Sequence, residues 1–213
     1  MSKIIAILNQ KGGSGKTTLA TNLARALQLG GDEVILVDSD PQGSSRDWNA
    51  ASDGALLPVI GLDRPTLNKD IKSVTANHDW IIIDGAPQIA ELAIAAIKCA
   101  DIVLIPVQPS PYDIWACADL VDVIKARQEV TDGKQPQAAF VISRSIKNTK
   151  LSKEIGVALN DYELPVFKSF TVQRIIYAAS AATGSTVLDE QRGGMASREM
   201  KKIAKELKEF VLC

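Results

Sequence analysis

Hydrophobic residues along this chain gather in short, dense runs that are separated by longer segments with helical spacing. The run Ile81-Ile82-Ile83 is apolar at every position, which is typical of a strand buried on both faces in a parallel sheet. We predict strands over Lys3–Asn9, Glu33–Asp38, Trp80–Asp84, Ile102–Val107 and Ala138–Ser143, and a short one at Val166–Lys168.

Between these strands, apolar residues recur every three or four positions, which indicates amphipathic helices packed on a sheet. We predict helices over Lys16–Gln28, Leu67–Ala76, Ile89–Cys99, Ile114–Glu129, Lys150–Asn160 and Ser197–Val211. This alternation predicts an α/β fold with a doubly wound, mostly parallel sheet flanked by helices, and with ligands at the carboxyl ends of the strands. We interpret Asp53–Pro65 as a loop within the domain and expect residues 1–213 to form a single domain.

A phosphate-binding loop joins the first strand to the first helix. Its glycines let successive backbone N–H groups point inward and form an anion site at a helix N-terminus. Lys16 is expected to reach the β- and γ-phosphates, and Thr17 to offer a hydroxyl to Mg²⁺. The predicted nucleotide-binding residues of the loop are Gly12, Gly13, Ser14, Gly15, Lys16, Thr17 and Thr18.

The loop departs from the usual spacing G-x-x-x-x-G-K-[ST]. Gln10 stands where the first glycine belongs, and Lys11 follows it directly. A lysine so close to bound phosphates points to a role for its charge. We therefore predict that the charge of Lys11, like that of Lys16, acts on the bound phosphates.

Three carboxylates follow predicted strands on the side where the loop lies. Asp38 and Asp40 come after the second strand, and Asp84 ends the run Ile81-Ile82-Ile83. Carboxylates at this edge can hold Mg²⁺ and orient a water molecule towards the terminal phosphate. Each aspartate alone would also fit ordinary turn chemistry. All three together with the lysine-bearing loop predict a Mg²⁺-dependent nucleotide hydrolase.

Charge distinguishes the last third of the chain, although the net charge is only −1. Residues 1–132 carry 11 Lys and Arg against 17 Asp and Glu, whereas residues 133–213 carry 13 against 8. A basic region of this kind fits contact with nucleic acid or an anionic surface, and equally fits solvated helix faces.

Cysteine usage and hydropathy predict a cytoplasmic protein. Cys99, Cys117 and Cys213 are scattered without metal-ligand spacing, as expected in a reducing compartment. No apolar stretch approaches the ~20 residues that a membrane-spanning helix needs.

Three sequence segments resemble motifs of the ParA/MinD ATPases. KGGSGKTT is similar to the deviant Walker A motif, DSDPQ to Walker A′ and IIIDGAP to Walker B. Pro106–Asp113 and Thr171–Arg174 are also similar to that family, and the length resembles the small plasmid-partition ParA proteins of the ParF type. The resemblance implies a P-loop NTPase of the deviant Walker A type that uses ATP and Mg²⁺.

The resemblance also implies a role for each residue of the site. Lys11 would reach across a homodimer interface to the phosphates of the other subunit, and Asp40 would position the attacking water. Thr17, Asp38 and Asp84 would serve the Mg²⁺ shell. The segment Pro109–Asp113 would abut the nucleotide and the facing subunit, and Arg144 and Thr171 would lie near the adenine.

The function that this resemblance implies is plasmid partition. An ATP-bound homodimer, open to further polymerisation, would bind nucleoid DNA without sequence preference. A small centromere-binding adaptor would stimulate its slow hydrolysis and release it. The predicted DNA-binding residues are Arg144, Lys147, Lys150 and Lys153, with Lys201 and Lys205 on the terminal helix. The apolar stripe of that helix is predicted to be core.

Several alternatives remain open at this stage. A MinD-like positioning ATPase would need a C-terminal amphipathic helix free to enter a bilayer, and the glutamates of this tail disfavour membrane binding. A nitrogenase-type ATPase would need cluster-ligating cysteines, whereas Cys99 and Cys117 fit small buried hydrophobes better. A metabolic synthetase would need a small-molecule site, which the sequence does not locate. A family member that moves a cargo other than a plasmid also fits.

Overall fold

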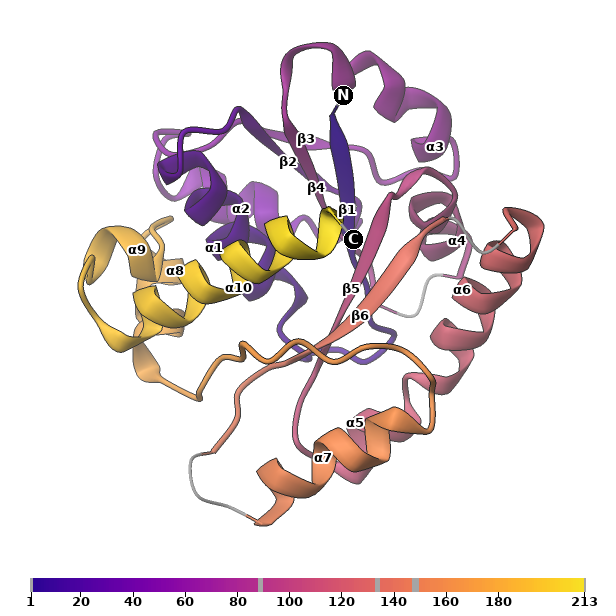
Figure 1. The fold of residues 1–213 in the computed structure, drawn as a ribbon. Helices are drawn as coiled ribbons and strands as arrows, with labels where there is room; N and C mark the ends of the chain where they lie inside the picture. Colours follow the sequence, from indigo (N-terminus) through magenta and orange to yellow (C-terminus); the bar gives the residue numbers. More distant parts are fainter. Residues whose placement is uncertain (1, 88–89, 133–134, 147–149, 213) are drawn as a thin grey trace.

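A six-stranded, entirely parallel sheet forms the centre of the computed structural model, which describes residues 2–87, 90–132, 135–146 and 150–212 (Figure 1). The strand order is β3-β2-β4-β1-β5-β6, so β1 lies inside the sheet between β4 and β5. The strands are β1 Lys3–Ile7, β2 Val34–Asp38, β3 Val59–Gly61, β4 Trp80–Asp84, β5 Ile102–Val107 and β6 Gln137–Ile142. The predicted fold class is confirmed.

Helices cover both faces of this sheet (Figure 1). They are α1 Lys16–Leu29, α2 Ser44–Ala50, α3 Leu67–Asp70, α4 Ala90–Cys99, α5 Pro111–Trp115, α6 Ala118–Val130, α7 Lys150–Asn160, α8 Ile175–Ala182, α9 Val187–Glu190 and α10 Met195–Val211. Two 3₁₀ turns, η1 Ile71–Ser73 and η2 Thr75–Asn77, follow α3.

Alternate residues of each strand pack against different helix layers. In β1, Ile5 and Ile7 join the core under α1, α9 and α10, whereas Ala6 joins the core under α4, α6 and α7. All three side chains are fully buried. Burial on both faces explains why the strands are apolar at every position.

The apolar stripe of α10 is part of the core, as predicted. Met200, Ile203 and Leu207 are fully buried and pack in the same cluster as Leu23 and Leu27 of α1. Among the described residues, no helix combines the length and apolarity required to cross a bilayer.

Two predicted helices differ in the structure because tighter hydrogen bonds interrupt them. The helix predicted over Leu67–Ala76 ends at Asp70, where the Ser73 hydroxyl donates to the Asp70 carbonyl at 2.7 Å and 3₁₀ turns follow. The helix predicted over Ile114–Glu129 begins earlier, at Pro111, and breaks after Trp115. There the Cys117 N–H bonds to the Ile114 carbonyl three residues back, which offsets α5 from α6.

The predicted strand at Val166–Lys168 is wrong, and several short elements, among them α9, were not predicted. Val166 forms only a single bridge to Phe140, and the Lys168 and Ser169 N–H groups donate to the Glu206 carboxylate at 2.7 and 2.8 Å instead of to a strand. The segment interpreted as the loop Asp53–Pro65 contains β3, which extends the sheet beside β2. Helix α2 was also missed.

We expect Gly184→Ala to destabilise the fold through α2. Gly184 has φ +64°, and a Cβ there would lie 2.5 Å from the Ser52 nitrogen and 2.6 Å from the Trp48 carbonyl oxygen. Overpacking of this kind lowers the free energy of unfolding by about 1–3 kcal/mol. The left-handed backbone conformation is unfavourable for alanine and lowers it by about 1 kcal/mol more. Urea unfolding measures the loss. Gly193→Ala, where an added Cβ meets nothing within 4 Å, is the control, and equal midpoints for the two variants would refute the expectation.

Candidate nucleotide-binding and hydrolysis site

The loop between β1 and α1 has the backbone shape of a phosphate cradle. Gly13 and Gly15 have φ of 75° and 100°, a conformation that favours glycine. Gly15 is the residue before α1, so the N–H groups of the first helical turn face the loop. The local sequence thereby forms an anion site at a helix N-terminus.

Lys16 is held ready for an anion at the start of α1. Its side chain is largely buried, and Nζ donates to the Lys11 carbonyl at 3.2 Å. Burial lowers the pKa of Lys16, while the nearby charges of Asp84 and Asp40 act in the opposite direction. A cation that has lost most of its water gains strongly from a phosphate oxygen, as the predicted role requires.

Asp84 at the end of β4 has a free oxygen where a divalent cation would need one. The residue is 1% exposed, its Oδ2 accepts from the Ser45 hydroxyl at 2.8 Å, and Oδ1 has no hydrogen-bond partner among the described residues. Burial raises the pKa of Asp84 to about 7, the Thr17 and Ser45 hydroxyls lower it, and Asp38 adds a smaller increase. A buried carboxylate with an unpaired oxygen near a hydroxyl fits a Mg²⁺ shell. The part of Ser45 was not predicted.

Asp38 shapes the loop that carries Asp40. It is fully buried at the end of β2, and its Oδ1 accepts from the Asp40 N–H at 3.0 Å. Its Oδ2 accepts from the Arg46 N–H at 2.9 Å, and the Arg46 guanidinium lies 3.4 Å away. Both oxygens are thus engaged by the chain itself, which is a structural role that the sequence did not suggest. The place of Asp38 in a metal shell stays a prediction.

Asp40 is held in the turn that follows β2. Its carboxylate Oδ1 accepts from the Gln42 N–H at 3.0 Å, and its carbonyl accepts from the Arg46 guanidinium at 2.9 Å. Its charge acts on Lys16, which places the two residues within electrostatic reach of each other. A carboxylate so held can orient water near the phosphate that Lys16 binds.

Lys11 has a fixed backbone and a side chain turned towards α5. Its N–H donates to Asn9 Oδ1 at 2.8 Å, and its carbonyl accepts from Lys16. Its Nζ lies 2.5 Å from Oδ2 of Asp113, a buried residue in the middle of α5. Gln108, just after β5, adds a contact of 2.8 Å to the Gly13 carbonyl. The segment was predicted to lie near the nucleotide, but the pairing of Asp113 with Lys11 was not predicted.

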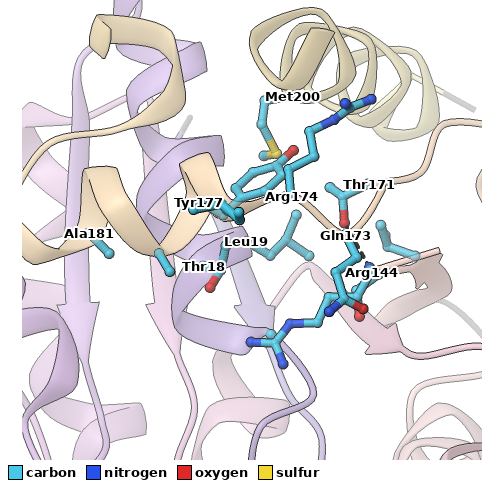
Figure 2. A pocket seen from close by; sticks show the side chains of 14 residues that line it. Thr18, Leu19, Arg144, Thr171, Gln173, Arg174, Tyr177, Ala181 and Met200 are labelled. Atoms are coloured by element: carbon cyan, nitrogen blue, oxygen red, sulfur yellow. Dashed lines mark hydrogen bonds between the residues drawn. The ribbon is translucent and has the colours of Figure 1, made fainter. Parts of the chain in front are cut away.

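A cavity of about 470 Å³ opens beside the start of α1 and is large enough for a base and a sugar. Arg144 and Thr171, which are predicted to lie near the adenine, both line it, and the Arg144 N–H donates to the Thr171 hydroxyl at 3.1 Å. Arg144 has φ 51°, which costs a non-glycine residue about 1 kcal/mol and often marks a functional position. Figure 2 shows Tyr177 and Met200 on the side of the cavity away from Arg144. Tyr177 is a wall residue that was not predicted.

One carboxylate connects this cavity with α10. Glu199 accepts from the Val172 N–H at 3.2 Å, from the Arg174 guanidinium at 2.8 Å and from the Tyr177 hydroxyl at 3.2 Å. The wall of the cavity is therefore fastened to a helix whose outer side carries Lys201 and Lys202.

The predicted DNA-binding residues fall on separate helices. Lys201 and Lys205 are exposed on α10, with Lys205 3.7 Å from Glu209. Lys150 and Lys153 lie on α7, but their side chains and the whole of Lys147 are outside the described residues. Figure 1 shows α10 across the front of the sheet and α7 at the bottom. Arg144 lies at the cavity, so the four residues of the predicted cluster are not shown as one surface.

Three comparisons place this arrangement among known proteins. A sequence profile described as the CobQ/CobB/MinD/ParA nucleotide binding domain matches residues 5–187. Maintenance of carboxysome distribution protein A from Halothiobacillus neapolitanus is 30% identical over 210 residues, 95% of each chain. The ATP complex of Cyanothece McdA(D38A) has a TM-score of 0.75 at 18% identity, over 99% of this chain and 96% of that one. MinD of Pyrococcus horikoshii with Mg-ADP also has 0.75 at 18%, over 97% and 96%. Both structural similarities show a shared fold.

Proposed function

This chain belongs to the CobQ/CobB/MinD/ParA nucleotide-binding family, and we propose that it is a positioning ATPase whose ATP-bound homodimer binds DNA without sequence preference. Its cofactors are ATP and Mg²⁺. ATP hydrolysis dissociates the dimer and releases the DNA. An adaptor protein bound to the cargo accelerates this hydrolysis.

Each residue of the site has a part in this reaction. Lys16 and the backbone N–H groups of Gly12–Thr18 hold the phosphates, and Thr17 with Asp84 would hold Mg²⁺, which neutralises phosphate charge when bound. Asp40 orients the attacking water. Asp38 and Arg46 keep the Asp40 turn in place. Arg144, Thr171 and Tyr177 line the place of the nucleoside.

The observation that carries the proposal is the second lysine of the phosphate loop. Lys16 already supplies the cation that a phosphate loop needs inside one subunit. Lys11 has its backbone pinned by Asn9 and Lys16, while its side chain is 39% exposed. A cation presented at the surface beside the phosphates suits delivery to a facing subunit, where it stabilises charge that develops on the transferred phosphoryl group.

The cargo is proposed from the relatives. The chain resembles the small ParF-type partition proteins. Their cargo is a plasmid, to which a centromere-binding adaptor is bound. The Halothiobacillus relative is named for carboxysome distribution, and 95% of each chain matches. We favour a non-plasmid cargo of that kind for this chain, carried over the nucleoid by the same cycle.

Membrane attachment through the C-terminal helix is disfavoured by packing. The apolar residues that would enter a bilayer, such as Ile203 and Leu207, are buried against α1. Releasing them would expose core on α10 and α1 together, at roughly 25 cal/mol per Å² of apolar surface.

We expect α10 to supply phosphate contacts to DNA. Lys201 and Lys202 are both exposed there, and reversing both charges should weaken ATP-dependent DNA binding at least about tenfold and make its salt dependence less steep. Fluorescence anisotropy of a labelled random duplex, with ATP or ADP over a range of salt, measures both quantities. A DNA affinity that is the same with ATP and ADP in the unaltered protein would refute the proposed cycle.

The control variant reverses the charges of two exposed lysines, Lys69 of α3 and Lys98 of α4, in the helix layer on the other face of the sheet from α10. If both double variants lost DNA affinity equally, net charge and not α10 would be responsible. The variant Lys147→Ala/Lys150→Ala tests the other predicted cluster in the same assay, and a loss confined to it would move the DNA surface to α7.

A further inference from the structure

A hollow of about 510 Å³ lies between the start of α10 and the segment that joins α7 to α8. Its apolar lining includes Phe170, which is 42% exposed, and Met195, which is 53% exposed. Apolar side chains that stay exposed together and are bordered by polar ones mark interaction sites. The hollow shares no lining residue with the nucleoside cavity, so the nucleotide does not account for it.

The border of this hollow is positively charged. Three exposed cations line it and belong to none of the ion pairs among the described residues: Lys168, Arg198 and Lys202. The carboxylates of α10 nearby are already engaged, because Glu199 pairs with Arg174 at 2.8 Å and Glu206 accepts from two backbone N–H groups. Unpaired cations beside an apolar lining are complementary to an anion that also carries an apolar group.

We propose that this hollow binds an acidic peptide segment with apolar side chains, supplied by the cargo-bound adaptor, and that the segment displaces DNA from α10. An apolar side chain of the segment fills the space beside Phe170 and Met195, while its carboxylates pair with the cations at the border. The inference rests on the proposed DNA-binding cycle. It adds the chemistry of the adaptor segment and the place where that segment docks.

An acidic peptide accounts for both features of the hollow. DNA would satisfy the cations through its phosphates, but its charged backbone offers no apolar chain to cover Phe170 and Met195. A bilayer takes up apolar side chains that project from a surface, whereas these two line a concave space. A peptide in which carboxylates and apolar side chains lie close together meets both requirements at once.

Lys202 gives the adaptor segment and DNA a shared contact. It lines the hollow and is also one of the two α10 lysines proposed to contact DNA phosphates. Arg198 lies four residues before it, so the two cations occupy the same side of the helix, and Lys201 is adjacent. Two anionic ligands that need the same cation repel each other and exclude one another. An adaptor on the cargo would therefore release DNA by direct competition as well as through hydrolysis.

Fluorescence anisotropy with two labelled synthetic peptides tests the docking site. The first peptide alternates glutamate with leucine and phenylalanine, and the second has serine in place of each apolar residue. The unaltered protein with ATP and Mg²⁺ is expected to bind the first at least about tenfold more tightly, the effect of burying one apolar side chain. Phe170→Ala and Arg198→Glu should each weaken binding of the first peptide at least about tenfold, and Phe170→Leu should restore part of it.

Two exposed positions away from the hollow supply matched controls. Val130→Ala on α6 removes an exposed apolar side chain, and Lys69→Glu on α3 reverses an exposed charge. Both should bind the first peptide normally, and urea unfolding verifies that all variants fold. Equal affinity for the two peptides, or an unchanged affinity in Phe170→Ala, would overturn the docking site. Co-sedimentation with phosphatidylserine vesicles that depends on Phe170 would also overturn it, by assigning the hollow to a membrane.

Displacement of a labelled random duplex tests the competition. The first peptide should release the duplex from the unaltered ATP-bound protein, whereas the serine peptide at the same concentration should not. Phe170→Ala should bind the duplex within about twofold of the unaltered protein, because phosphate contacts need charge, and should keep it when the first peptide is added. Peptide binding without loss of DNA would overturn the competition. A DNA affinity that is the same with ATP and ADP would refute the proposed function instead, and peptide binding to the hollow would stand.

Discussion

Replacing Lys16 with alanine is expected to abolish ATP binding, whereas replacing Lys11 should spare binding by the single subunit and remove turnover. Lys16 is the buried cation at the start of α1, and it also ties the loop together through the Lys11 carbonyl. Lys11 contributes its side chain elsewhere, to Asp113. The two lysines of one loop should therefore give different phenotypes.

The measurement is a fluorescent ATP analogue titrated into each variant, paired with phosphate release in the presence of DNA and adaptor. Lys16→Ala should show no saturable binding. Lys11→Ala should bind within about threefold of the unaltered protein and turn over about 10²–10³-fold more slowly, the range for one lost charge-stabilising group. Equal turnover by Lys11→Ala and the unaltered protein would rule out a catalytic role for Lys11 across the interface.

Asp84→Asn is expected to stabilise the nucleotide-free fold while removing Mg²⁺-dependent turnover. Burial raises the pKa of Asp84 to about 7 from 3.8, so the folded protein binds this proton more tightly than the unfolded chain. For such a group, stability is lost as pH rises from about 4 to about 7 and then stays constant. The neutral asparagine side chain of the variant avoids that loss. Each unit of difference between the folded and unfolded pKa of Asp84 corresponds to about 1.4 kcal/mol of stability.

The gain in free energy of unfolding should therefore be about 1–4 kcal/mol at pH 8 and clearly smaller at pH 5. Urea unfolding in EDTA at the two pH values measures it, with Asp122→Asn at an exposed position of α6 as the control. ATP turnover of Asp84→Asn with Mg²⁺ should fall at least about 100-fold. A gain in stability over the unaltered protein that was smaller at pH 8 than at pH 5 would contradict this expectation.

Long elements with a strong pattern could be predicted, and short ones could not. The buried strands and the helices α1 and α10 could be predicted from the spacing of their apolar residues. Their packing in the two cores agrees with that local pattern. With three residues in β3 and seven in α2, both elements are too short to show a hydrophobic periodicity. Pairing at the edge of the sheet fixes β3, and burial of Trp48 fixes α2. The failed strand at Val166–Lys168 depended on Glu206, which lies 38 residues away from Lys168.

The same limit applies to the candidate site. Residues inside contiguous motifs, from Gly12 to Thr18 and at Asp38, Asp40 and Asp84, could be proposed as site residues because local spacing carries their chemistry. Partners that meet across the fold could not. The pairing of Asp113 with Lys11 spans 102 positions, and the Ser45 hydrogen bond to Asp84 spans 39. Nothing in the spacing of such residues records that they touch.

The hydrogen bonding of three residues to Glu199 has a thermodynamic consequence for the whole cycle. The Glu199 carboxylate is carried by the helix proposed to hold DNA and accepts hydrogen bonds from Arg174 and Tyr177, which line the cavity proposed to hold the nucleoside. If nucleotide occupancy changes DNA affinity by some factor through this connection, DNA must change nucleotide affinity by the same factor. The nucleoid would then act as an allosteric effector of ATP retention, so a subunit resting on DNA would keep its nucleotide longer than one that diffuses freely.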